Sequence, residues 1–525
     1  MKLVTDHYQK LSKIAIFSGI IFRLKHYFEN CSFWVDEAAI ALPIINRNSR
    51  DIILGIGNVT EGFPTAPIGF LLTEKGIINL FPNCEYSLRL FPLICSIISL
   101  GLFYKLIKNY WGNSLRTLIA LTFFVLADPL IYYAAELKPY SCDVMFTAML
   151  LLFSNYLYKK DSTPRQLLFF GILCAVVIWF SYPAVFVVAG IGLNIMFFCL
   201  KQNNKKKLLY FLCSSIMIFT SFIILYKIEL NAIDQNNFYL KWWSGGFMPI
   251  DSSLIDSLLW VRNVALEMFR SVVGLYFTAL AFSLFMVGII SFYSQDKKAM
   301  FILISPLLIV FTAAIINRYP FKGRMILFLA PILCIFLTEG IYRISSYFRK
   351  YFLWTSVTLL FLLLFYPITL QIKKFLYPTH KKEEMREVVE YLKVHYSPGD
   401  SVYLNTAAQN TFGYYHGYFD MGNQPMLVGK IIYNVSKEIN TVLIRHVYFN
   451  FNDQGYLNGY RKEENYKLLA DLRSFKDNPR TWIIFSHYSE KRTQWLLDYL
   501  NKKGHKMDEF IQEGAAVYLY NLSPL

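Results

Sequence analysis

The chain has 525 residues, of which 55% are hydrophobic, 18% aromatic and only 17% charged, and its mean hydropathy is +0.36. This composition excludes an ordinary soluble enzyme and predicts an integral membrane protein with many spans. The formal net charge of +16 comes mostly from short loops between apolar stretches, without a basic helix or an aromatic RNA-binding signature. We therefore expect membrane lipids, and no nucleic acid, as partners of these cations.

Apolar stretches of about 18 to 25 residues recur through the first ~370 positions, roughly eleven of them. They begin near Ile14, Leu88, Leu115, Tyr140, Leu167, Ala184, Leu208, Val272, Ala299, Met325 and Phe352. The first stretch lacks a small-residue cleavage site, so we expect it to remain as an anchor. The fold class expected is an α-helical polytopic membrane protein of about eleven transmembrane helices.

The lysines and arginines of the loops predict the orientation of the spans. With a cytoplasmic N-terminus, the cytoplasmic side collects Lys2, Lys10, Lys13, Lys105, Lys108, Arg116, Lys159, Lys160, Arg165, Lys201, Lys205, Lys206, Lys207, Lys297, Lys298, Arg343, Arg349 and Lys350. This pattern obeys the positive-inside rule. We expect the opposite, extracytoplasmic face to carry the first outer loop and the C-terminal part.

The composition divides the chain into two predicted domains, a transmembrane domain (residues 1–372) and an extracytoplasmic soluble α/β domain (residues 373–525). In the first, the outer loop of about residues 30–85 is too polar to cross the bilayer, and its segments 37–45 and 68–80 are typical of interfacial helices. In the second, residues 381–395 and 490–503 have helical periodicity, and 401–404, 481–485 and 515–520 resemble strands. No Gly-rich nucleotide loop or nucleophile elbow occurs there.

An adjacent pair of carboxylates, Asp36-Glu37, directly follows the first apolar stretch. Charges near a bilayer are costly unless they are paired or hydrated, so this pair suggests chemistry at the membrane surface. Arg89, Asp128, Glu136, Lys138 and Asp143 also map to the outer ends of spans, which predicts one shared outer cavity. For Arg89 and Asp128 a purely structural role stays open as the alternative to a place in this cavity. Glu85 and Arg89 could form an i,i+4 pair that closes a helix end, and Asp128-Pro129 could end a helix.

One outer turn breaks the positive-inside rule, because Arg318, Lys322 and Arg324 fall within a short loop. These cations either snorkel to lipid phosphates or form a built phosphate clamp. A second polar cluster, Glu136, Lys138, Tyr140 and Asp143, surrounds Pro139, which prevents a continuous helix. This cluster is either a polar wall for a sugar or pyrophosphate-like head, or a set of charges that Lys138 neutralises.

Two further features carry open alternatives. Trp242 and Trp243, in a glycine-containing outer loop, either anchor the chain at the interface or stack on a sugar and cover the donor. Cys31 and Cys84 lie near the two ends of the first outer loop, where an oxidising compartment could pair them. No Cys/His zinc pattern is present.

Together these motifs resemble the GT-C superfamily of membrane glycosyltransferases. The chain is similar to the branch with protein O-mannosyltransferases, the lipid A aminoarabinose transferase and the rhizobial galacturonosyltransferases. The resemblance covers roughly the first 370 residues and is carried by Trp34-Val35-Asp36-Glu37-Ala38, the Pro64/Pro67 connector, Glu85 to Leu90, Glu136 to Asp143 and Tyr319 to Arg324.

The resemblance implies that a sugar is moved from a polyprenyl-phosphate carrier to an acceptor hydroxyl on a lipid, glycan or protein. The family's acidic base matches Asp36, with Glu37 as its helper, and a positioned base typically contributes ~10²–10⁴-fold. Arg318, Lys322 and Arg324 are the candidates for holding the lipid phosphate, with Lys138 and Arg89 in reserve, and Glu136, Tyr140, Asp143, Trp242 and Trp243 complete the expected substrate site.

No second carboxylate is identifiable as a nucleophile, which favours a single inverting displacement. We expect no required cofactor and no metal site, although Asp36 and Glu37 could bind a divalent cation weakly. The alternative function is a transporter or flippase of a lipid-linked sugar. That alternative predicts charges at the bilayer midplane and paired halves, neither of which the sequence shows.

Overall fold

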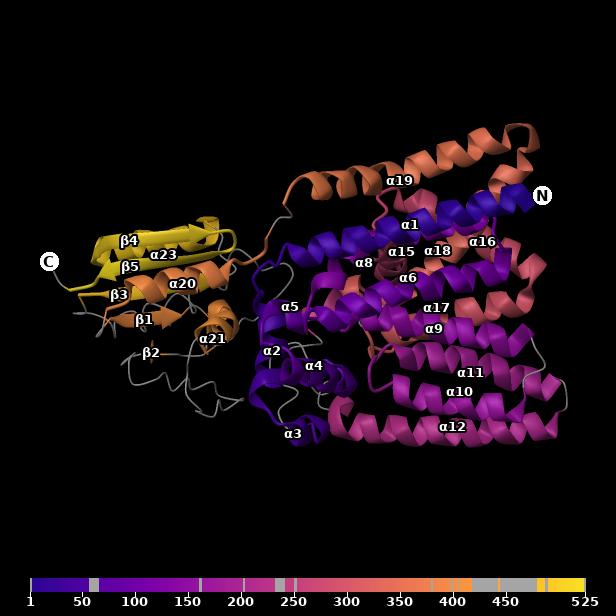
Figure 1. The fold of residues 1–525 in the computed structure, drawn as a ribbon, viewed down its shortest axis with the longest axis horizontal. Coiled ribbons are helices and arrows are strands. Elements are labelled where there is room, and N and C mark those ends of the chain that lie inside the picture. Colours follow the sequence, from indigo (N-terminus) through magenta and orange to yellow (C-terminus); the bar gives the residue numbers. More distant parts are fainter. Residues whose placement is uncertain are drawn as a thin grey trace.

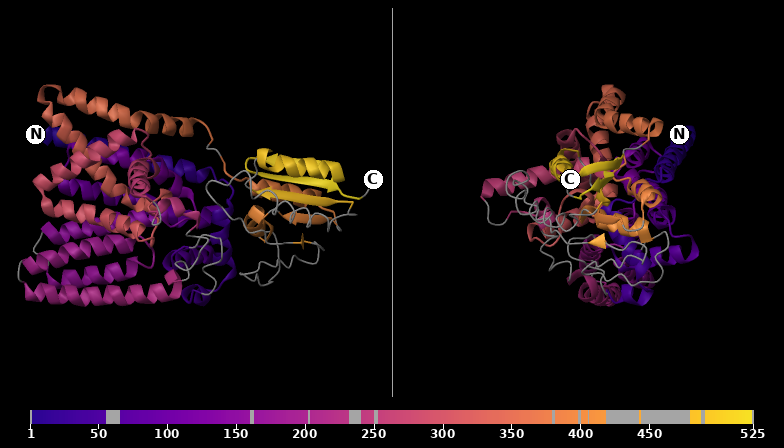
Figure 2. Two further views of the ribbon diagram at one scale, coloured as in Figure 1. Left: turned by 180° about the vertical axis from the view of Figure 1, so that it is seen from behind. Right: turned by 90° about the vertical axis from the view of Figure 1, so that its left-hand side faces the viewer.

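The computed structural model describes residues 2–55, 66–159, 163–201, 204–231, 241–249, 253–378, 381–397, 400–404, 406–417, 442–443, 479–486 and 490–523. A bundle of roughly parallel helices forms one end of an elongated molecule and a small sheet with flanking helices forms the other (Figure 1). The short helices of the first loop lie between these two parts, and Figure 2 shows the same division from behind.

The membrane part consists of long apolar helices. They are α1 (Lys2–Phe28), α6 (Leu90–Trp111), α7 (Leu115–Leu126), α9 (Tyr140–Lys159), α10 (Pro164–Val177), α11 (Ala184–Lys201), α12 (Lys205–Leu225), α15 (Leu254–Val273), α16 (Thr278–Gln295), α17 (Lys297–Ile315), α18 (Ala330–Tyr347) and α19 (Phe352–Leu376). All eleven expected stretches fall on helices. The N-terminus of α1 lies at the end of the bundle away from the sheet (Figure 1).

By length and composition, seven of the described helices could cross a membrane, or eight if the bent pair of α7 and the segment after it is one span. The expected count of eleven is therefore not reached. The difference arises because α10 is only 14 residues long and because α1 and α9 carry polar and charged side chains that lower their hydropathy.

The segment after α7 is bent by 57° at Asp128. Pro129 stands in the first turn of α8 (Asp128–Tyr132), where a missing N–H is tolerated, so the helix restarts in a new direction. The helix-ending role expected for Asp128-Pro129 is confirmed. A 3-10 turn, η1 (Tyr133–Ala135), then leads through residues 136–139 into α9.

The described residues of the first loop form four helices, α2 (Val35–Asn46), α3 (Ser49–Ile53), α4 (Ile68–Leu80) and α5 (Glu85–Leu88). The two helices expected at 37–45 and 68–80 are thus confirmed as α2 and α4. The connector with Pro64 lies outside the described residues, whereas Pro67 is the residue that precedes α4. These helices cover the end of the bundle that faces the sheet (Figures 1 and 2).

The C-terminal part contains α20 (Met385–His395), β1 (Ser401–Leu404), α21 (Gln409–Gly417), β2 (Val442–Leu443), β3 (Thr481–Ser486), α23 (Glu490–Lys503), β4 (His505–Gln512) and β5 (Ala515–Asn521). The strand order is β2-β1-β3-β5-β4. Strand β1 is parallel to β2 and β3, and β5 is antiparallel to β3 and β4. The expected helices and strands are confirmed, whereas α21, β2 and β4 were not predicted; β4 is an exposed edge strand with few apolar residues.

Buried polar contacts tie the C-terminal part to the first loop. Glu85 accepts hydrogen bonds from Arg386 Nε and from the Tyr415 hydroxyl, each at 2.8 Å. The Phe33 amide in turn donates to the Tyr415 hydroxyl at 2.6 Å. Glu85 is therefore paired across the domains, and the alternative of an i,i+4 pair between Glu85 and Arg89 is wrong.

Candidate active site

Three segments that are far apart in the sequence meet at Asp36, in the first turn of α2. The Asp36 Oδ2 atom lies 2.8 Å from Arg324 Nη2 and 3.6 Å from Lys138 Nζ. Lys138 also donates to the backbone carbonyl of Asp36 at 2.9 Å. Arg324 comes from η4 (Gly323–Leu329), directly before α18. The fold thus supplies one carboxylate and two cations at the loop end of the bundle.

The charges in this group change each other's proton affinity. Burial alone raises the pKa of Asp36, but the charges of Lys138, Arg324 and Lys382 outweigh it and hold the pKa below its ordinary value. Burial lowers the pKa of Lys138 to about 8, against the opposing effect of Asp36. Asp36 is therefore ionised at neutral pH, and Lys138 gains or loses its charge in the physiological range.

Glu37 points away from Asp36 into the protein. Arg89 donates to both of its oxygens, Nε to Oε1 at 2.8 Å and Nη2 to Oε2 at 2.6 Å, and the Leu137 amide donates to Oε1 at 2.7 Å. Burial raises the pKa of Glu37, and the Arg89 contact opposes that effect. The two adjacent carboxylates therefore have different surroundings. In this arrangement Glu37 and Arg89 connect α2 to the turn before Lys138 rather than facing a ligand.

Aromatic rings enclose the Arg324 guanidinium. Its central carbon lies 5.7 Å from the ring centre of Trp34, 5.8 Å from that of Tyr140 and 5.4 Å from that of Trp243. Such cation–π contacts hold a guanidinium in place without neutralising it. The Trp34 indole N–H also donates to Glu136 Oε2 at 2.6 Å, which brings Glu136 into the same group.

The loop with the two tryptophans packs against the basic turn. Its 3-10 turn η3 (Ser244–Gly246) accepts a hydrogen bond from the Phe321 amide at the Gly246 carbonyl, 2.8 Å away. A Cβ atom on Gly246 would lie 2.8 Å from Pro320 Cβ, so this close approach requires glycine. Trp243 consequently reaches Arg324, whereas Trp242 is 47% exposed.

The three cations of the basic turn have different positions. Arg324 is turned inward onto Asp36, and the side chains of Arg318 and Lys322 are exposed. Arg324 and the other two cations of the turn therefore have different surroundings, and the clamp and snorkelling alternatives stay open. Asp143 is buried in α9, one turn from Tyr140. Among the described residues, Asp143 makes no ion pair with the group around Asp36.

Asp128 does not join the shared cavity that we expected. Its carboxylate accepts hydrogen bonds from Lys374 Nζ at 2.6 Å and from Gln371 Nε2 at 2.9 Å, both on α19. It therefore fastens α8 to α19. Cys31 and Cys84 are both free thiols, so no disulfide closes the first loop.

The described residues do not fit a metal centre. They contain no group of three His, Cys, Asp or Glu side chains that could hold an ion. Asp36, the acidic side chain nearest the cations, is engaged by Arg324 and Lys138, and hard divalent cations require several oxygen ligands. We therefore derive no step through a metal.

Sequence reasoning missed two residues of the group, Trp34 and Lys382. Trp34 lies within the motif around Asp36, and its position just before the carboxylates was the available signal. Lys382 Nζ lies 3.7 Å from the ring centre of Trp34. No signal marked Lys382, because its approach to Trp34 depends on how the C-terminal part docks.

The sequence matches a model of the family described as dolichyl-phosphate-mannose-protein mannosyltransferase over residues 65–226. No curated protein sequence matches the chain significantly. Among solved structures, ArnT from Cupriavidus metallidurans bound to undecaprenyl phosphate is 11% identical, with a TM-score of 0.52 and coverage of 98% of both chains. The chain has the fold of the GT-C membrane glycosyltransferases.

Two further structures share this GT-C fold. The apo form of the same ArnT is 10% identical over 94% of this chain and 96% of that chain, with a TM-score of 0.50. The Archaeoglobus fulgidus oligosaccharyltransferase, solved as a complex with Zn and sulfate, is 12% identical over 98% of this chain and 73% of that chain, with a TM-score of 0.53. The family match includes Arg89 and Lys138 but neither Asp36 nor Arg324.

Proposed function

We propose that the protein transfers a sugar from a polyprenyl-phosphate carrier to an acceptor hydroxyl, with Asp36 as the general base. The observation that carries the proposal is the meeting of Asp36 with Arg324 and Lys138 at the loop end of a membrane bundle. Acid–base chemistry on a hydroxyl needs a carboxylate, and a lipid-phosphate leaving group needs fixed cations. Both are present in one place.

Asp36 is suited to receive the proton of the acceptor. Its pKa is held low, so the carboxylate is ionised and ready at neutral pH. In the transfer, the acceptor oxygen forms a bond to the anomeric carbon while the bond from that carbon to the phosphate oxygen breaks. The proton passes to Asp36, and the bonding electron pair leaves with the phosphate. Proton transfer late in this displacement contributes ~10²–10⁴-fold.

Arg324 and Lys138 are suited to hold the departing phosphate. Each charge-assisted contact contributes about 1.5–3 kcal/mol. A phosphate that attracts these cations also weakens their hold on Asp36, and its negative charge raises the pKa of that carboxylate. The base therefore becomes stronger when the donor is bound. This coupling links donor binding to proton removal without a further residue.

The stereochemistry of transfer, the roles of the other residues near Arg324 and the side of the membrane are proposed from the same contacts and charges. Asp36 is the carboxylate that faces the cations, and Glu136, the other carboxylate of the group, accepts the Trp34 indole N–H, which favours a single inverting displacement with one base. Tyr140 and Trp243 are placed to pack against a sugar near Arg324, with Glu136 as a hydrogen-bonding partner. The exposed Arg318 and Lys322 are placed to attract the anionic donor. We place this group and the C-terminal part on the extracytoplasmic face, from the loop charges, and the protein in a bacterial inner (plasma) membrane, from the resemblance to bacterial glycosyltransferases.

The comparisons support a polyprenyl-phosphate donor. One structural neighbour, ArnT, was solved with undecaprenyl phosphate bound, and the matching family is named for a dolichyl-phosphate-linked sugar. A lipid carrier also explains why the charged group lies at the end of a membrane bundle. The acceptor proposed is a lipid, a glycan or a protein at the same face.

The test uses purified Asp36→Asn in reconstituted membranes. We expect its transfer from a polyprenyl-phosphate sugar to fall about 10²–10⁴-fold, while donor binding stays within a few-fold of the wild type. Asp51→Asn is the matched control, because Asp51 lies in α3 of the same loop and, among the described residues, forms no ion pair with Lys138 or Arg324. Wild-type transfer rates in Asp36→Asn, at normal protein levels, contradict the mechanism.

A further inference from the structure

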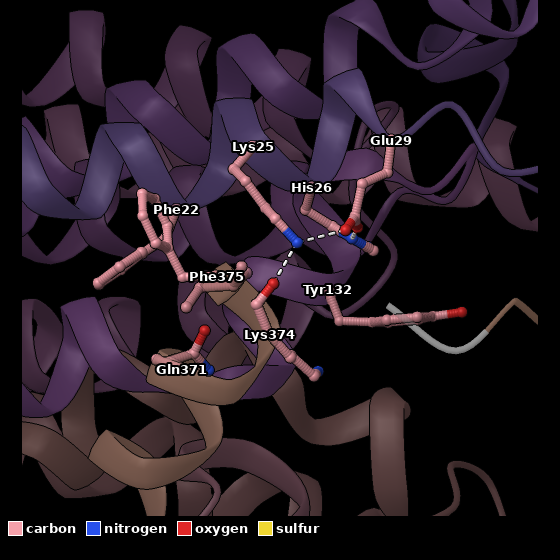
Figure 3. Close-up of a pocket in the computed structure, with 9 residues that line it drawn as sticks. Phe22, Lys25, His26, Glu29, Tyr132, Gln371, Lys374 and Phe375 are labelled. Carbon is pink, nitrogen blue, oxygen red and sulfur yellow. Dashed lines mark hydrogen bonds and ion pairs between the residues drawn. The ribbon is translucent and has the colours of Figure 1, made fainter. Parts of the chain in front are cut away.

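Residues 377–378 and 381–384, here called the strap, lie between α19 and α20, and Lys382 among them reaches the group around Asp36. The far end of the strap is fixed to the bundle. Lys25 of α1 donates to the backbone carbonyls of Lys374 and Tyr377, and Figure 3 shows it reaching between Glu29 and Lys374. The end of α19 therefore cannot swing freely away from α1.

The near end of the strap is fixed to the first loop. Glu384 accepts hydrogen bonds from the amide and hydroxyl of Ser32, each at 3.2 Å. Glu383 accepts one from the Val35 amide at 3.1 Å, at the start of α2, and both glutamates are buried. The residue before them, Lys382, is thereby held next to the turn of α2 that contains Asp36.

The C-terminal sheet also contacts the backbone at Lys382. A Cβ atom on Gly514, in the turn between β4 and β5, would lie 1.7 Å from the Lys382 carbonyl oxygen, so only glycine fits there. Gly514 also has a positive φ of 71°. The sheet thus determines where the backbone of Lys382 lies.

The Lys382 ammonium lies between two aromatic faces. It is 3.7 Å from the ring centre of Trp34 and 4.6 Å from that of Tyr132. Among the described residues, no carboxylate lies within ion-pair distance of it. Lys138 and Arg324 face the same Trp34 ring at 5.6 and 5.7 Å. Three cations therefore surround one indole. In the described part of the chain, Lys382 is the one of the three that forms no ion pair, although its charge helps to lower the pKa of Asp36.

We propose that Lys382 is a further phosphate-binding residue of the site, supplied by the C-terminal part through the strap. The inference rests on the proposed function. Its ligand is the phosphate monoester of a polyprenyl carrier, which an exposed cation on an aromatic platform can reach. With Lys138 and Arg324 it gives three positive charges for the leaving group.

The experiment measures binding of undecaprenyl phosphate to the full chain in nanodiscs. We expect Lys382→Ala to weaken binding about ten-fold, the value of one charge-assisted contact, and Lys382→Arg to restore most of it. Lys373→Ala is the matched control, an exposed lysine near the end of α19, and should bind as the wild type does. Unchanged affinity in Lys382→Ala overturns the proposal.

Two further ligands separate phosphate recognition from folding and from the proposed function. Uncharged undecaprenol should bind wild type and Lys382→Ala equally, and inorganic phosphate at millimolar concentration should not displace the lipid. Equal weakening of undecaprenol would show a merely structural Lys382 and overturn the proposal. If the wild type binds undecaprenyl phosphate through Lys382 but transfers no sugar, the proposed function fails and the inference about Lys382 holds.

Discussion

Asp36 and Arg324 form an ion pair of 2.8 Å across 288 residues of sequence. The pair joins the first turn of α2 to the start of η4, and Lys138 completes it from a third segment. Because the two side chains share one hydrogen bond, the role of either can be measured against the other.

A double-mutant cycle on this pair should be strongly non-additive. We expect Arg324→Ala alone to lower kcat/KM about 10- to 100-fold, from the loss of one charge-assisted contact to the leaving phosphate. In the Asp36→Asn background the further loss should be smaller, because contacting residues share their effect. Steady-state kinetics of the three variants check this. Strict additivity would show that the two side chains act independently.

Lys138 should set an alkaline limit to donor binding. Its pKa is lowered by burial to about 8, so the ammonium is charged below that pH and lost above it. Affinity for undecaprenyl phosphate should therefore fall between about pH 7 and about pH 9. In Lys138→Arg the guanidinium stays charged, and the fall should disappear. An identical alkaline profile in this variant would assign the titration to another group.

The Glu37–Arg89 pair should matter chiefly for stability. Both side chains are buried, with exposed fractions of 1% and 5%. Glu37→Gln leaves the buried Arg89 guanidinium without a counter-charge, which should cost about 3–5 kcal/mol of unfolding free energy. Replacing both residues, as Glu37→Gln with Arg89→Met, should recover part of this loss. Thermal unfolding in detergent measures the effect. A stable Glu37→Gln variant with selectively reduced transfer would instead support the expected role of Glu37 as a helper.

The two tryptophans of the η3 loop should differ. Trp243→Ala removes a ring from Arg324 and should raise the KM for the donor several-fold, since such contacts contribute about 0.5–2 kcal/mol. Trp242→Ala should have the smaller effect because its side chain is half exposed. Kinetics of both variants with the same donor decide between stacking and interfacial anchoring. A larger KM effect for Trp242→Ala would reverse this assignment.

Local patterns were sufficient for most of the elements. Apolar stretches located the bundle helices except α15, which was not predicted. The amphipathic segments of the first loop became α2 and α4, because side chains in such segments repeat with the period of the element. The polar edge strand β4 was not predicted, because its exposed residues form no apolar repeat. Among the described helices, α1, α9 and α10 do not reach the length and hydropathy of a span, although each coincides with an expected stretch.

The sequence by itself determined a helical membrane protein, a C-terminal α/β part and the candidate residues Asp36, Lys138 and Arg324. The tertiary structure decided which partners these residues have. In the folded chain Glu37 forms an ion pair with Arg89, Asp128 accepts a hydrogen bond from Lys374 of α19, and Lys382 lies over the ring of Trp34. The physical reason is that ion pairs and cation–π contacts depend on distances across the fold, which composition and periodicity along the chain do not contain.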